Sequence, residues 1–220
     1  MTVVHALRKA FEAVFDAILP LRARTARTRE LRPEDVPLDP TTHDLLGTQI
    51  TTLMNYRERP VADLIQSLKY DGSRHAAHIA ATVVADYLRE EVASHASFSQ
   101  KKVLIIPVPS HPTRMRERGF NQIELVLTAL PSEFKDGSIA TLRSDALVRS
   151  RDTKQQTRLT RSERLSNVAG AFALKDGADV RNTAIYLIDD VTTTGATLAN
   201  AATPLRRAGA SVILLALARA

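Results

Sequence analysis

The sequence predicts an α/β fold in which helices cover both faces of a parallel sheet, so that the domain has three layers. Three short segments favour buried strands, because apolar and β-branched residues fill them: 102–108, 184–188 and 211–218. Segments with helical character, 121–130 and 197–208, lie between successive strands. Strands that alternate with helices in this way form parallel sheets with helices packed on the faces.

The first 44 residues are expected to form an extension that precedes this domain. Residues 1–20 place apolar side chains at three- and four-residue spacing, which is typical of one helix face, and we expect this face to pack on the domain or on a partner in preference to a membrane surface. Residues 21–44 are rich in Arg, Thr and Pro and nearly lack large apolar residues, so we expect an irregular, basic, solvated segment. The predicted division is therefore 1–44 for the extension and 45–220 for the α/β domain.

Two further helices are expected before the first strand, over 60–68 and 76–88. His75 and His78 are three residues apart at the start of the second one, and we expect exposed side chains there in preference to a metal site. Pro204 is predicted to kink the last helix or to end it early, since proline removes a backbone donor.

Composition narrows the classes of function. The chain has 30 Lys and Arg against 24 Asp and Glu, a formal net charge of +6, which favours anionic partners such as phosphates, nucleotides or nucleic acid. It has no Cys, which excludes disulfides, thiolate nucleophiles and Cys-ligated zinc. Aromatic residues make up only 5%, so an aromatic platform for stacking bases has little material. No uncharged apolar run reaches the roughly 18 residues that a membrane span requires, and we expect a cytoplasmic protein.

The strongest functional signal is the segment 185–197, IYLIDDVTTTGAT. An apolar strand runs into Asp189 and Asp190, and a Thr-rich turn with Gly195 then leads into a helix. Backbone amides and hydroxyls at a helix N-terminus bind phosphate. The predicted phosphate cradle comprises Thr192, Thr193, Thr194, Gly195, Ala196 and Thr197. Carboxylates repel phosphate, so the two acids favour sugar hydroxyls or a cation, and together the parts indicate a site for a ribose 5-phosphate. A plain Thr-rich helix cap would leave the paired acids unexplained.

This pattern resembles the phosphoribosyl-diphosphate (PRPP) motif of type I phosphoribosyltransferases. The segments 56–72, 105–122 and 152–172, together with the closing LLALAR, resemble the ComF branch of that superfamily. The resemblance covers 45–220 in order. Members of this branch usually begin with a Cys-rich zinc-binding module, which this chain cannot form, so no function of that module is carried over.

The resemblance implies a type I phosphoribosyltransferase-like fold and further site residues. It assigns the diphosphate to the loop after the first strand and to the arginines behind it: Val108, Pro109, Ser110, His111, Arg114, Arg116 and Arg118. It assigns a mobile loop to the basic segment that follows: Lys154, Gln155, Gln156, Thr157 and the catalytic candidate Arg158. A basic loop without a ligand and a solvated surface loop are the respective alternatives. Asn121 could cap the next helix or face the site.

The function that the resemblance implies is transfer of a phosphoribosyl group from PRPP to a nitrogen of a nucleobase-like acceptor, with release of diphosphate. Asp189 and Asp190 would act as catalytic residues that hold the ribose hydroxyls, with Mg²⁺ bound indirectly or through those hydroxyls. The acceptor pocket is expected from 45–74. A non-catalytic PRPP sensor and a nucleic-acid-binding module for DNA uptake are the alternatives. PRPP and the acceptor are the expected partners, with nucleic acid, competence proteins or a second copy of the chain as further candidates.

Overall fold

The computed structural model describes residues 23–45, 47–96, 101–149 and 170–220. Its centre is a six-stranded sheet with the order β1-β2-β8-β7-β3-β4. The β1–β2 pair is antiparallel and the other four pairs are parallel. The strands are β1 (Thr41–Leu45), β2 (Thr48–Asn55), β3 (Lys102–Pro107), β4 (Thr141–Leu142), β7 (Thr183–Thr192) and β8 (Ser211–Arg219). The predicted α/β class with a mostly parallel sheet is confirmed.

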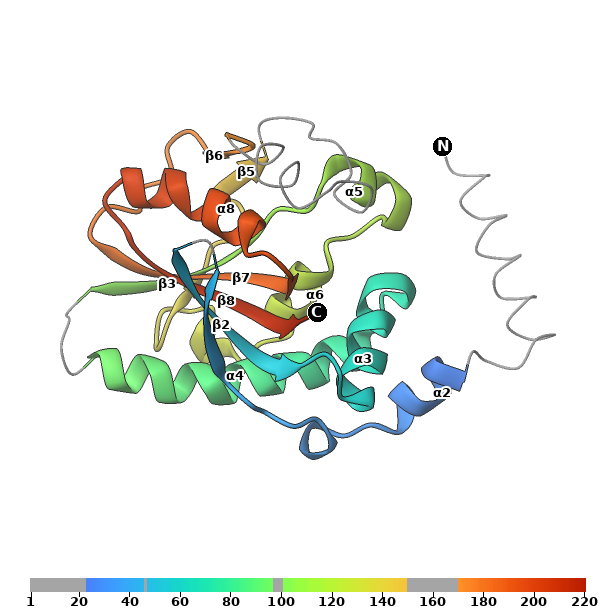
Figure 1. Cartoon of the computed structure of the whole chain (residues 1–220). Helices are drawn as coiled ribbons and strands as arrows, with labels where there is room; N and C mark the ends of the chain where they lie inside the picture. Colours follow the sequence, from blue (N-terminus) through green and yellow to red (C-terminus); the bar gives the residue numbers. More distant parts are fainter. Residues whose placement is uncertain (1–22, 46, 97–100, 150–169) are drawn as a thin grey trace.

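Helices cover both faces of the sheet, which gives the expected three layers (Figure 1). One face carries α3 (Arg59–Gln66), α4 (Arg74–Ala96) and α6 (Gln122–Thr128). The other face carries α8 (Ala196–Arg207), beside a two-stranded sheet of β5 (Leu147–Arg149) and β6 (Phe172–Leu174). The short helix α5 (Pro112–Arg118) lies between β3 and α6, and η3 (Ser132–Phe134) lies between α6 and β4.

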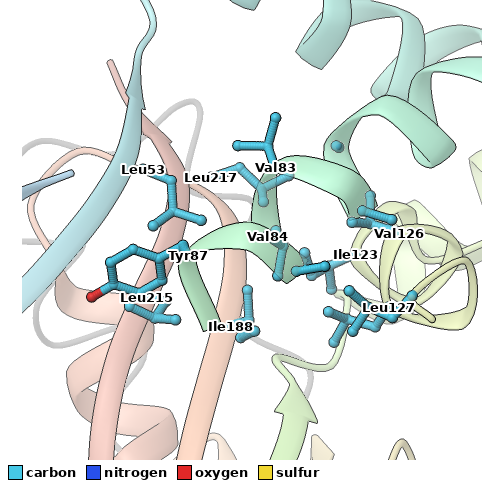
Figure 2. Close-up of a cluster of buried hydrophobic side chains, with 14 of the residues drawn as sticks. Leu53, Val83, Val84, Tyr87, Ile123, Val126, Leu127, Ile188, Leu215 and Leu217 are labelled. Carbon is cyan, nitrogen blue, oxygen red and sulfur yellow. The ribbon is translucent and has the colours of Figure 1, made fainter. Parts of the chain in front are cut away.

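Strand β7 is buried on both faces, which explains its nearly continuous apolar sequence. Tyr186 and Ile188 join the cluster between the sheet and helices α4 and α6. Ile185 and Leu187 join the cluster between the sheet and α8. Figure 2 shows the first cluster, where Ile188 lies close to Val84 of α4 and to side chains of α6. The sheet is therefore held rigidly from both sides, and its carboxyl edge is a fixed platform for the segments that leave it.

The expectation of an irregular segment over 21–44 is wrong for its described part. It contains α2 (Ala23–Glu30), η1 (Pro33–Asp35) and β1, and the expected boundary after residue 44 falls inside β1. Helix α2 docks on α3 through Arg27, whose Nε and Nη2 donate to the two carboxylate oxygens of Asp63 at 2.6 and 2.8 Å. Thr28 is buried and shares a hydrogen bond of 2.9 Å with Ser67. Polar contacts and strand pairing thus order a segment that has few apolar side chains. The predicted helix within 1–20 lies outside the described residues.

Two other expectations concern helices. Helix α8 does not stop at Pro204 but continues to Arg207, because the apolar side that it buries extends from Leu198 to Leu205. Its last turn closes where Ala208 N donates to Pro204 O at 3.1 Å. His75 and His78 are exposed, as expected, and His75 Nε2 forms a 2.9 Å hydrogen bond with the carbonyl of Leu31. Within the described ranges, no helix combines the length and the apolar character that crossing a membrane requires.

Candidate functional site

The carboxyl ends of the parallel strands meet at one edge of the sheet, where open α/β sheets place their ligands. Strand β3 ends at Pro107, and Val108 N still donates to Ile188 O of β7 at 2.9 Å. The predicted diphosphate loop, 108–111, therefore starts beside Asp189 and Asp190. The structure brings these two predicted parts of the site together, although they are far apart in the sequence.

The turn that follows the acids depends on glycine. Gly195 has φ +77° and serves as the N-cap of α8. A Cβ at this position would lie 2.6 Å from Ile50 Cδ1 and 2.9 Å from Leu45 Cβ. Both the left-handed backbone and the contact with the β1–β2 hairpin exclude a side chain. The hairpin is thus the structural support of the predicted cradle, a role that the sequence did not reveal.

The threonines of the cradle differ in accessibility. Thr192 is buried as the last residue of β7, and its carbonyl accepts from Ala220 N at 3.1 Å. Thr193 is exposed, whereas Thr194 and Thr197 are half-buried. These last three side chains lie around the N-terminus of a twelve-residue helix, where the positive end of the macrodipole favours an anion. Thr192 holds the turn in place, and the other three can reach a ligand.

Asp190 is buried and fully engaged within the protein. Its Oδ2 accepts from Gln122 Nε2 at 2.7 Å and lies 3.4 Å from Lys69 Nζ. Its Oδ1 accepts from Val191 N at 2.6 Å. These contacts fix the orientation of the carboxylate and offset its charge with an ammonium group.

Asp189 has a different environment from its neighbour. It is half-buried, and its Oδ1 accepts from Asp190 N at 2.8 Å. Burial, and then the charge of Asp190, raise the pKa of Asp189 to about 7. Near neutral pH the pair therefore carries less than two full negative charges, which lowers its repulsion of a nearby phosphate.

Lys69 and Gln122 were not predicted as site residues. Lys69 belongs to η2 (Ser67–Asp71), a π-helical turn of a type often found at functional sites. Gly72 ends this turn at φ +57°, and the ring of Phe120 lies 2.9 Å from where its Cβ would be. Asp71 and Gly72 thus close the turn, and Phe120 packs against it. The only signal in the sequence was that Lys69 and Gln122 lie within segments that carry the family resemblance.

The arginines behind the diphosphate loop lie on α5, which begins where the Nδ1 of His111 accepts from Thr113 N at 3.2 Å. Arg118 is half-buried above the ring of Tyr70, at 5.6 Å from its centroid, and its Nη1 donates to Gln122 Oε1 at 3.2 Å. Burial, and then the charge of Arg114, lower the pKa of Arg118. This guanidinium is thus partly desolvated, and pairing with an incoming anion would offset the free-energy cost of its burial.

The remaining predicted residues fall into two groups. Asn121 caps α6, since its Oδ1 accepts from Ile123 N at 3.2 Å and its Nδ2 donates to Val108 O at 3.3 Å. It therefore anchors the diphosphate loop to α6. The predicted mobile loop lies outside the described residues: Lys154, Gln155, Gln156, Thr157 and Arg158.

The described residues of this site offer a metal ion only part of a coordination shell. Among the described residues, no three His, Asp or Glu side chains come together as a binding group. Asp190 already faces Lys69, so the half-buried Asp189 is the carboxylate better placed to contact a hydrated cation or a sugar hydroxyl. Such a donor set fits Mg²⁺ if substrate oxygens and water supply the other ligands.

Comparison with known proteins gives relatives over most of the chain. Competence protein ComFC of Streptococcus pneumoniae is 29% identical over 165 residues, which are 75% of this chain and 65% of that protein. DNA utilization protein YhgH of Shigella flexneri is 30% identical over 166 residues, which are 75% of this chain and 69% of that protein. The chain thus spans about two thirds of the length of these relatives.

No protein-family model matches the chain. Among solved structures, a hypoxanthine phosphoribosyltransferase from Staphylococcus aureus matches with a TM-score of 0.32 and 12% identity, over 62% of this chain and 73% of that one.

Proposed function

Because this chain belongs to the ComF family, we propose that it binds PRPP at the carboxyl edge of its sheet and acts as a phosphoribosyltransferase. The observation that carries the proposal is the continuity of β7, the two acids, the Gly195 turn and α8 in one rigid segment. Few ligands need a phosphate cradle directly beside paired carboxylates. A ribose 5-phosphate is one, since its hydroxyls and its phosphate are held a fixed distance apart.

In this proposal each part of the edge has one task. Thr193, Thr194, Thr197 and the backbone amides of the turn hold the 5-phosphate. Asp189 accepts hydrogen bonds from the ribose hydroxyls, while Asp190 is held behind it. The loop 108–111 and the arginines of α5 hold the diphosphate. Asp189 would hold Mg²⁺ together with water and substrate oxygens, and the ion would supply positive charge that offsets the charge of the diphosphate.

The proposed reaction is displacement at ribose C1. A nitrogen of a nucleobase-like acceptor forms the new bond to C1 with its lone pair, and the bond from C1 to the diphosphate oxygen breaks with its electron pair. The transition state has the character of an oxocarbenium ion, so the protein contributes mainly orientation and electrostatic stabilisation. The acceptor nitrogen then loses its proton to water or to a base.

The test is calorimetric titration of the protein with PRPP, with and without Mg²⁺, followed by an assay of diphosphate release with a panel of purine and pyrimidine bases. Binding with release supports the transferase. Binding without release for any base supports a PRPP sensor instead. Absence of PRPP binding in both conditions refutes the proposal.

A second candidate is binding of DNA, which the names of the relatives favour, since they refer to competence and to DNA utilization. The formal net charge of +6 is compatible with it. Binding to single-stranded DNA should weaken steeply as salt increases, because neutralising phosphates releases counterions. Fluorescence anisotropy with a labelled oligonucleotide at several salt concentrations tests this second candidate function. An affinity that salt does not change would contradict a phosphate-driven DNA interaction.

A further inference from the structure

We propose that Gln122 is a positioning residue that holds Arg118 and Asp190 apart, so that Arg118 stays available for an anionic group of the ligand. This inference rests on the proposed function, because that function assigns Arg118 to the diphosphate and gives Asp190 a supporting place behind Asp189. Gln122 touches neither group of the ligand and acts through its two neighbours.

The side chain of Gln122 uses both ends of its amide. Gln122 is only 4% exposed. Its Nε2 donates to Asp190 Oδ2 at 2.7 Å, and its Oε1 accepts from Arg118 Nη1 at 3.2 Å. A neutral amide can satisfy a carboxylate and a guanidinium at the same time without neutralising either. No other neutral side chain of this length has one donor end and one acceptor end.

Arg118 keeps its charge unpaired because of this arrangement. Among the described residues, no carboxylate lies within 4.0 Å of its guanidinium. Its other interactions are a contact with the Tyr70 ring, repulsion from Arg114, and smaller attractions to the charges of Asp190 and Glu117, neither of which is paired with it. A half-buried cation with a neutral partner and a like charge nearby gains more from an incoming polyanion than a cation that is already paired.

Asp190 has its own counter-charge in Lys69, so it does not need Arg118 as an ion-pair partner. Lys69 Nζ lies 3.4 Å from Asp190 Oδ2, the same oxygen that accepts from Gln122. The positive charges at this edge are therefore divided: Lys69 offsets Asp190, and Arg118 remains for the ligand. Without the amide, Arg118 could swing toward Asp190 and form a direct ion pair, and that pair would remove its charge from the ligand.

Two substitutions of Gln122 test this. Gln122→Met keeps the length and removes both hydrogen bonds. Gln122→Glu keeps an acceptor for Arg118 but adds a charge that pairs with it and repels Asp190. Val126→Ala, a buried position on the same helix, is the matched control for loss of packing in α6. Each variant is first assayed by denaturant unfolding, so that affinities are compared between folded proteins.

The probes are inorganic diphosphate and ribose 5-phosphate, titrated separately by calorimetry into the whole protein. We expect diphosphate affinity to fall about tenfold in Gln122→Met, the scale of one lost charge-assisted hydrogen bond, and further in Gln122→Glu. Ribose 5-phosphate affinity should change less than about threefold in Gln122→Met. Val126→Ala should bind both probes as the wild type does, whatever its stability.

The outcomes separate this inference from the proposed function. Wild-type diphosphate affinity in both Gln122 variants overturns the inference and leaves PRPP binding intact. Equal losses for both probes overturn it as well, because Gln122 would then support the whole edge. A wild type that binds neither probe overturns both proposals. If the Gln122 variants fail to fold, Arg118→Met takes their place: it should weaken diphosphate binding about tenfold, and unchanged binding would overturn the inference.

Discussion

The two adjacent aspartates show how differently neighbouring residues of one strand can be used. Asp190 is fixed by Gln122, Lys69 and a backbone amide, whereas Asp189 has one backbone donor and a pKa raised to about 7. Strands place successive side chains on opposite faces, so the two carboxylates meet different surroundings although they are adjacent in sequence. This division predicts that Asp190 contributes structure and Asp189 contributes the group that meets the ligand.

Asp189 should make the stability of the protein depend on pH. A carboxyl group titrates near pH 4 in an unfolded chain. Its native pKa is raised to about 7, so between about pH 4 and pH 7 the unfolded chain loses this proton while the native protein keeps it. The contribution of Asp189 to the free energy of unfolding therefore falls as pH rises through this window. Above about pH 7 this loss of stability is complete.

The measurement is urea unfolding at several pH values for the wild type and for Asp189→Asn. The difference in stability between the two should grow in favour of the variant as pH rises from about 4 to 7. Asp176→Asn, an exposed position in the loop before β7, serves as the control. A pH-independent difference for Asp189→Asn would contradict the raised pKa.

Removing both charges tests the ribose assignment directly. The double variant Asp189→Asn with Asp190→Asn should weaken Mg²⁺-dependent PRPP binding by roughly 1–3 kcal/mol, the scale of lost charge-assisted hydrogen bonds. Calorimetry with PRPP and Mg²⁺ measures this loss, and titration with inorganic diphosphate is the control. Unchanged PRPP affinity in a folded double variant would remove the ribose assignment.

At the scale of elements, the turn after β7 depends on the β1–β2 hairpin as much as on its own sequence. Gly195 packs against Ile50 and Leu45 of the hairpin. Gly195→Val should abolish binding of ribose 5-phosphate, because a Cβ must displace the hairpin and a branched side chain disfavours the positive φ. Calorimetry with ribose 5-phosphate measures this, and circular dichroism shows whether the fold persists. Normal binding in a folded variant would refute the phosphate cradle.

The elements that the sequence predicted correctly are those whose signal is local. Strands β3, β7 and β8 are apolar because both faces are buried, and the Gly195 turn needs a residue without a side chain. The hairpin was missed because β1 is short, polar and mostly exposed, and because β8, the parallel partner of β2, lies at the other end of the chain. Helix α2 was missed because its docking relies on an ion pair with a residue 36 positions away, which no local pattern encodes.

The same limit applies to the candidate site. The acids and the glycine were recognisable because β7 and its turn form one continuous segment. Gln122 contacts Asp190 across 68 residues, and Lys69 reaches it from a π-helical turn. Such contacts depend on how α6 and η2 pack against β7, and that packing arises only in the folded chain.

At the scale of the whole molecule, the described segments form one interlocked unit. Helix α2 packs on α3, β1 pairs with β2, and β2 pairs with β8, so residues 23–45 are tied to the same sheet that carries the site. This integration differs from the division after residue 44 that the sequence suggested. A unit built this way should unfold in a single transition in which these residues lose protection together with the core.

Hydrogen exchange with mass spectrometry, measured at increasing urea concentration, tests this prediction. Peptides from β1 and β2 should exchange with the same free energy and the same urea dependence as peptides from β7 and β8. Adding ribose 5-phosphate at about a hundred times its dissociation constant should raise the free energy of exchange of both sets of peptides by about 2.7 kcal/mol. A ligand of the native state stabilises every element that unfolds with the site. If only the β7 peptides gained protection, β1 and β2 would open independently, and the support of the cradle by the hairpin would be ruled out.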